Sequence, residues 1–130
     1  MRKIILCAVL TIIVSVIFAQ IPPQKMTYQT VVRDANNELV VNQQIGVKIS
    51  VLATLPNGLP VYEETHFVQT NHNALATIVV GTGTPTPGSV FANIDWANDD
   101  FYLKCEIDPA GGSNYTIIGT QQLITVPYAF

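Results

Sequence analysis

Two segments of this chain alternate apolar and polar residues with a period of two, and they constrain the fold more than any other feature. In residues 45–51 every second residue is apolar, and Gly46, Lys48 and Ser50 lie between them. Residues 101–108 repeat the pattern and place Cys105 on the apolar side. Because successive side chains of a strand point to opposite faces, each segment predicts a strand with one buried and one polar face.

Further strands are predicted at near-regular spacing, separated by segments rich in Asp, Asn, Pro and Gly. They comprise residues 26–33, 61–68, 75–80, 115–119 and 123–128. Residues 89–100 lack this alternation and predict a single short helical turn. The sequence therefore predicts an all-β fold, a seven- to eight-stranded antiparallel β-sandwich of immunoglobulin or prealbumin-like type, formed by one domain over residues 26–130.

The N-terminus has the pattern of a secretory signal peptide. Arg2 and Lys3 precede an apolar run over residues 4–18, which is shorter than the roughly 20 residues that a membrane-spanning helix needs. A small residue, Ala19, then precedes Gln20. We expect residues 1–19 to be the signal peptide, cleavage between Ala19 and Gln20, and an extended, proline-containing lead-in over residues 20–25. The mature protein is expected to be secreted or held at the cell surface, without membrane insertion.

The charge of the mature chain argues against nucleic acid as a partner. Four basic residues, Lys25, Arg33, Lys48 and Lys104, stand against nine acidic residues, so the net charge is about −5. Phosphate backbones and anionic lipids are bound by clustered Lys and Arg.

Cys7 leaves with the signal peptide, so no disulfide can form within the mature monomer, and Cys105 is predicted to be a buried core thiol.

Six runs of residues are distinctive together: Pro23-Gln24-Lys25-Met26-Thr27-Tyr28-Gln29, Val31-Val32-Arg33-Asp34-Ala35-Asn36, Val61-Tyr62-Glu63-Glu64-Thr65-His66, Gly81-Thr82-Gly83, Asn93-Ile94-Asp95-Trp96 and Val126-Pro127-Tyr128-Ala129. They resemble a domain found in exported proteins of the Bacteroidetes. The resemblance implies the N-terminal β-sandwich of a surface or tail-fibre-like protein, and it supplies no catalytic residue. A looser similarity links the chain to carboxypeptidase regulatory-like, prealbumin-like domains, although Ala74 stands where such turns usually have Gly.

Two groups of residues are candidates for ligand binding. Asp95, Asp99 and Asp100, with Asn98, are candidate calcium ligands, and the alternative is that they cap and solvate a loop. Trp96, Tyr102 and Tyr115 are candidate stacking residues for a sugar or peptide, with Tyr62 and Tyr128 as further members, and the alternative is that they fill the core.

Other polar residues are interpreted as structural. His66 and His72 are too few for a zinc site. Glu63 and Glu64 point to opposite faces of one strand, so they cannot form a glycosidase pair, and a solvated strand face is expected. Residues 81–84 lack the lysine of a phosphate-binding loop and are interpreted as a turn.

We therefore expect an exported, non-enzymatic structural or adhesive module of the cell surface, without cofactor or catalytic residues. The alternative is a β-sandwich module that binds carbohydrate or peptide. A further alternative is a subunit that assembles with itself or with other surface proteins by β-strand addition. In that case the last predicted strand would lie at a sheet edge, because Pro127 cannot donate a ladder hydrogen bond.

Overall fold

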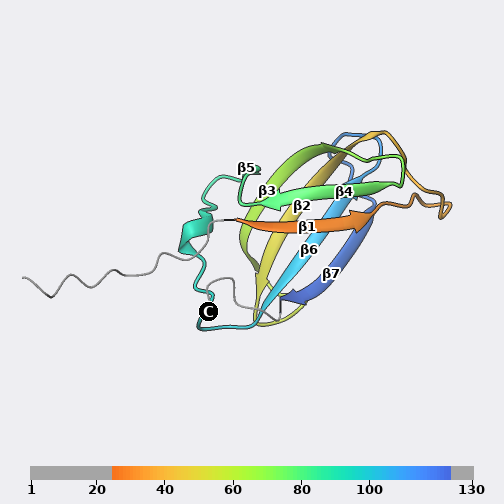
Figure 1. Cartoon of the computed structure of the whole chain (residues 1–130). Helices are drawn as coiled ribbons and strands as arrows, with labels where there is room; N and C mark the ends of the chain where they lie inside the picture. Colours follow the sequence, from red (N-terminus) through yellow and green to blue (C-terminus); the bar gives the residue numbers. More distant parts are fainter. Residues whose placement is uncertain (1–24, 124–130) are drawn as a thin grey trace, which may run out of the picture.

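The computed structural model describes residues 25–123 (Figure 1). The predicted signal peptide, its cleavage site at Ala19 and Gln20, most of the lead-in and the C-terminal residues 124–130 lie outside this range. Within it, Lys25 immediately precedes the first strand. Among the described residues, no helix is both long and apolar enough to cross a membrane.

The described chain forms seven strands in two antiparallel sheets, which confirms the predicted all-β sandwich. One sheet has two strands in the order β1-β4 and the other has five in the order β5-β3-β2-β6-β7. Figure 1 shows the smaller sheet lying across one face of the larger. The strands are β1 (Met26–Val31), β2 (Gln44–Ala53), β3 (Pro60–Gln69), β4 (Leu75–Val80), β5 (Thr84–Pro85), β6 (Phe101–Asp108) and β7 (Ile117–Leu123).

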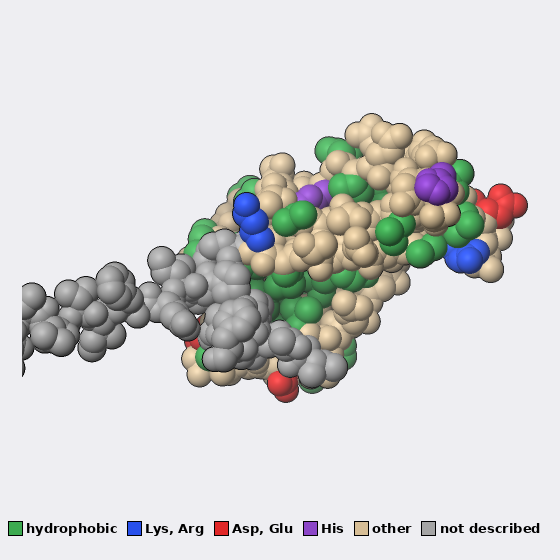
Figure 2. All heavy atoms as spheres, viewed as in Figure 1, with side chains coloured by type: hydrophobic (Ala, Val, Ile, Leu, Met, Phe, Trp, Pro, Cys, Tyr) green, Lys and Arg blue, Asp and Glu red, His purple; other side chains and the backbone are tan. Residues whose placement is uncertain are grey.

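As far as the described residues show, the sandwich is closed on one side and open on the other. On the closed side the chain passes from β4 through residues 81–83 into β5, which pairs with the outer edge of β3. On the open side β1 and β7 form the borders of their sheets. Figure 2 shows hydrophobic side chains exposed in the gap between these two strands.

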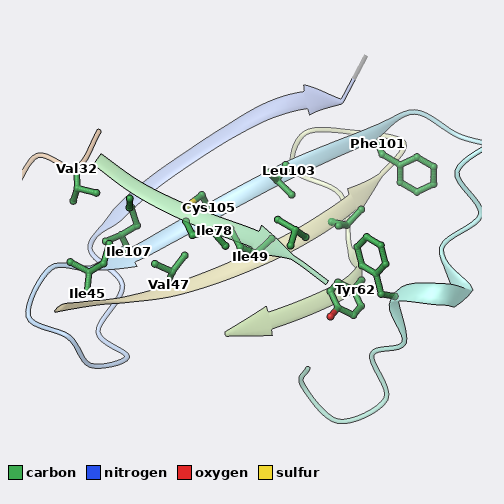
Figure 3. Packing of buried hydrophobic residues seen from close by; sticks show 14 of the residues in the cluster. Val32, Ile45, Val47, Ile49, Tyr62, Ile78, Phe101, Leu103, Cys105 and Ile107 are labelled. Carbon is green, nitrogen blue, oxygen red and sulfur yellow. The ribbon is translucent and has the colours of Figure 1, made fainter. Parts of the chain in front are cut away.

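The core lies between the sheets and contains the apolar residues that the alternation predicted. Ile45, Val47, Ile49 and Val51 of β2 are all fully buried. Figure 3 shows Val47 and Ile49 beneath Ile78 of β4, with Cys105 and Leu103 of β6 beside them. Each fully buried aliphatic side chain contributes about 1.5 to 3 kcal/mol relative to an exposed one, so this layer is the main source of stability.

Asx turns reverse the chain at two of the predicted positions. The Asp34 carboxylate accepts the N–H groups of Asn36 and Glu38, at 2.9 and 3.0 Å. The Asn71 side chain accepts the N–H groups of residues 73 and 75 in the same way. Ala74 follows with φ of 61°, a left-handed conformation that glycine adopts more readily than alanine.

Several regions differ in detail from the sequence-based expectation. Strand β5 begins within residues 81–84, which were interpreted as a turn, and β1 ends at Val31 rather than at residue 33. The short helical turn is a 3-10 turn, η1 (Phe91–Asn93). The strand expected over residues 115–119 instead runs from Ile117 to Leu123, because its backbone pairs with β6 along its whole length. Most of the separate strand expected over residues 123–128 lies outside the described residues.

The outer face of β2 is partly covered, which the alternation did not predict. Gly46 is buried beneath the loop of residues 109–114, and its Cα approaches the Gly112 carbonyl so closely that a methyl group would clash. Asp108 organises this loop by accepting the N–H groups of Ala110 at 2.9 Å, Gly112 at 2.9 Å and Asn114 at 3.0 Å. These hydrogen bonds hold the pKa of the Asp108 carboxyl below its usual value, with the bond from Ala110 contributing most.

Candidate functional site

A polar groove with a volume of about 480 Å³ lies on the outer face of the five-stranded sheet. We call it the outer groove. The loop that contains Pro56-Asn57-Gly58 borders it at one end. Strands β2, β3 and β6 supply its floor through Lys48, Ser50, Leu52, Glu63, Lys104 and Glu106.

Opposite charges are balanced within the outer groove. The Lys48 Nζ lies 3.8 Å from the Glu63 Oε2 and 3.9 Å from the Glu106 Oε1. The Lys104 Nζ lies 3.5 Å from the same Glu106 oxygen. Partly exposed ion pairs of this kind contribute only about 0 to 1 kcal/mol each to stability. The groove therefore presents hydrogen-bond donors and acceptors without net charge, which suits a neutral, polar ligand.

Tyr102 and Tyr115 both lie at this outer face. Tyr102 shares its face of β6 with Lys104 and Glu106, and it is partly exposed. The Lys48 Nζ lies 5.9 Å from the centroid of the Tyr115 ring, a cation–π distance. Burial raises the pKa of the Tyr115 hydroxyl, and Lys48 opposes this shift. Two of the three predicted stacking residues therefore lie on the same sheet face as the outer groove, although neither is among the residues that line it.

Trp96, the third predicted stacking residue, belongs to a row of aromatic rings in the core. It is only 5% exposed. Its ring lies 5.8 Å from Phe91 and 5.0 Å from Phe101, and Phe91 in turn lies 5.1 Å from Tyr62. Trp96 and Tyr62 thus adopt the core-filling role that was the alternative for these residues, while Tyr128 lies outside the described residues.

The candidate calcium ligands do not converge on one point. Asp95, Asn98 and Asp99 line a cavity of about 280 Å³, but Asp100 does not. Asp95 accepts a hydrogen bond from the Asn98 side chain at 2.6 Å, and Asp99 accepts one from the Thr54 hydroxyl at 2.8 Å. Within residues 25–123, no group of three or more His, Cys, Asp or Glu side chains is arranged to hold a metal ion.

Glu64 is the clearest correction to the sequence-based interpretation, because a solvated strand face was expected and the side chain is completely buried. Its carboxylate accepts the N–H of Gly81 at 2.6 Å and that of Gly83 at 2.9 Å, and it contacts the His66 ring. The glycine-rich turn therefore does bind an anion, supplied by the chain itself. The glycines were visible in the sequence, but their partner lies on another strand.

Cys105 is buried as predicted, at 4% exposure. Burial raises the pKa of its thiol to about 12, and the nearby Glu106 adds to the shift. A thiol with such a pKa is almost entirely protonated at neutral pH, and the thiolate is the nucleophilic form. The residue therefore acts as a small apolar core side chain.

The fold and these sites define a class of protein: an antiparallel β-sandwich whose buried carboxylates accept hydrogen bonds from its own loops. Residues 27–121 match a family described as a domain of unknown function (DUF8740), and the chain belongs to that family. No curated protein and no solved structure matches the chain. The similarity to tail-fibre-like and prealbumin-like domains remains a prediction.

Proposed function

We propose that this protein is an exported, non-enzymatic structural or adhesive module of the cell surface. The observation that carries the proposal is that the buried side chains of Glu64 and Asp108 accept hydrogen bonds from the protein's own loops. Both carboxylate oxygens of Glu64 bind residues 81–83, and both oxygens of Asp108 bind the loop of residues 109–114. Buried ionisable groups in a cleft are the usual candidates for catalysis. In this protein Glu64 and Asp108 instead hold loops in place, which favours a structural role over a catalytic one.

Export and surface location are supported by the N-terminal sequence and by the resemblance to domains of exported proteins. In this proposal the sandwich is the N-terminal domain of a fibre-like surface protein. Its two sheets present loops and strand edges to neighbouring proteins.

Mass spectrometry and protease accessibility on intact producing cells test the proposal. We expect a mature N-terminus at Gln20 and removal of the domain by protease added to unbroken cells. Deletion of the coding sequence should reduce adhesion or weaken the cell surface. Retention of Met1 in a protease-protected, cytoplasmic fraction would overturn the proposal.

A second candidate function, binding of a carbohydrate or peptide, is favoured by the outer groove. Its balanced Lys and Glu side chains, together with the Tyr102 and Tyr115 rings on the same sheet face, match the mixture of polar and stacking contacts that sugars require. A glycan array probed with Tyr115→Ala tests this function. Phe67→Ala is the matched control, because Phe67 is an aromatic residue of β3 that is 65% exposed, whereas Tyr115 lies beside the groove residue Lys48. Binding lost in the Tyr115 variant alone would support the second candidate.

A further inference from the structure

The two strands that border the open side carry none of the residues that normally protect sheet edges. Strand β1 reads MTYQTV and β7 reads IIGTQQL, without a charged residue or a proline. Soluble proteins usually protect exposed edge strands with charges, prolines or bulges, because a free edge recruits further strands. The closed side differs, since β5 has only two residues and one of them is Pro85. The unprotected side is therefore suited to accept a strand.

An apolar slot lies between these two edges. It has a volume of about 100 Å³. A methyl group added to Gly119 would meet no other atom of residues 25–123 within 4 Å, so this part of the structure leaves the inner side of β7 open at this point. In Figure 2 hydrophobic side chains are visible between β1 and β7. The slot is lined chiefly by Tyr28 and Thr30 of β1, Cys105 and Ile107 of β6, and Ile117 and Gly119 of β7.

The residues that follow β7 have the composition of a strand that would fill such a slot. In residues 124–130, Ile124, Val126, Tyr128 and Phe130 alternate with Thr125, Pro127 and Ala129. This period of two predicts an extended strand with one apolar face. Pro127 is compatible with an added edge strand, because its missing N–H can face solvent.

The same residues are poorly suited to fold back onto their own domain. The slot lies near Ile117 and Gly119, at the start of β7, whereas residues 124–130 leave from its end at Leu123. Returning to Gly119 would require a reversal immediately after Leu123. Tight reversals mostly use Gly, Pro, Asn, Asp or Ser, and residues 124–126, which would have to form this one, contain none of them.

We propose that the slot between β1 and β7 binds residues 124–130 of a second copy of this chain, so that copies assemble by strand exchange. The added strand pairs with the edge of β1 or β7 through main-chain hydrogen bonds, and one of its apolar side chains enters the slot. This inference rests on the structural role proposed above and deepens it by naming the partner.

Two point variants of the full mature chain separate the donor from the acceptor. Val126→Asp/Tyr128→Asp places charges on the apolar face of the donor strand but leaves the slot intact. Gly119→Leu fills the slot from an open position and leaves the donor intact. Circular dichroism and urea unfolding identify any variant that fails to fold, and Gly119→Ala is the milder replacement in that case.

Analytical ultracentrifugation over about a hundredfold range of protein concentration gives the readout. We expect the average mass of the unmodified protein to rise with concentration, and each variant alone to stay monomeric. An equimolar mixture of the two variants should form a dimer and nothing larger, because it contains one working donor and one working slot.

Three results would overturn the inference. They are an unmodified protein that stays monomeric throughout, variants that associate as strongly as the unmodified protein, and a mixture that forms no dimer. None of these results depends on whether the protein is adhesive or binds a glycan, so failure of the inference is distinguishable from failure of the proposed function.

Discussion

The carbonyl of Gly112 lies directly over Gly46, so that the loop between β6 and β7 packs onto the backbone of the central strand β2. There is no space for a side chain between them. This contact explains why a glycine interrupts the outer face of the most regular strand in the sequence.

We expect Gly46→Ala to lower the free energy of unfolding by about 2 to 3 kcal/mol, because the added methyl group must push the loop away. Urea unfolding followed by circular dichroism measures the change. Gly119→Ala is the matched control, since it also replaces a strand glycine but meets nothing. It should raise stability by about 0.5 kcal/mol, because alanine restricts the unfolded chain. Equal effects of the two substitutions would contradict the close contact at Gly46.

Replacing Glu64 by Gln should cost about 2 to 3 kcal/mol of stability. The amide keeps the shape of the carboxylate but presents a donor where the N–H of Gly81 or Gly83 requires an acceptor. The neighbouring Glu63→Gln changes the same type of residue at a partly exposed position and should alter stability by less than about 0.5 kcal/mol. Thermal unfolding of both variants tests the difference. A Glu64 variant as stable as the Glu63 variant would show that the hydrogen bonds from Gly81 and Gly83 to Glu64 do not stabilise the fold.

Asp108 should make the protein sensitive to acid. The pKa of Asp108 is lower in the folded state than in the unfolded chain. Between these two pKa values the folded state therefore binds fewer protons than the unfolded chain. Its contribution to stability is therefore present above the unfolded value of about 3.9 and is lost as the pH falls through the lower folded pKa.

In Asp108→Asn this part of the pH dependence should disappear, and stability at neutral pH should fall, because the amide cannot accept all three hydrogen bonds. Unfolding midpoints measured from neutral pH down to well below the unfolded pKa of about 3.9 test both effects. Glu38→Gln, at an exposed position, is the control and should retain the slope of the unmodified protein. An unchanged slope in the Asp108 variant would contradict the prediction.

The Cys105 thiol should react at least about 100-fold more slowly with a bulky disulfide reagent in the native protein than in the unfolded protein. Burial raises its pKa to about 12, and the side chain is 4% exposed. Since the folded pKa lies above the unfolded value, its contribution to stability is full below about 8.5 and falls as the pH rises beyond that. Thiol labelling with and without denaturant measures the ratio, and rapid native labelling would show that the core opens at β6.

The strands were predictable because their alternation is a local property of the sequence. Ile45, Val47, Ile49 and Val51 had to share one face of β2 whatever they packed against. The Asx turns at Asp34 and Asn71 were predictable for the same reason, since their hydrogen bonds span only a few residues.

Features that depend on distant contacts were not predictable. Glu64 was expected to face solvent because nothing in the strand shows that residues 81–83 will fold over it. Trp96 could have been a surface platform or a core residue, and only the positions of Phe91 and Phe101 decide between them. The outer groove likewise required the order of β3, β2 and β6, which a single sequence does not specify.

The aromatic row gives the protein a built-in optical reporter. Trp96 is the only tryptophan in the chain, and it lies between Phe91 and Phe101 at one end of the sandwich. Its fluorescence emission therefore reports on the packing of η1 and β6 without contribution from any other indole. Loosening at this end of the molecule will be visible as a red shift, separately from the loss of strand structure that follows global unfolding.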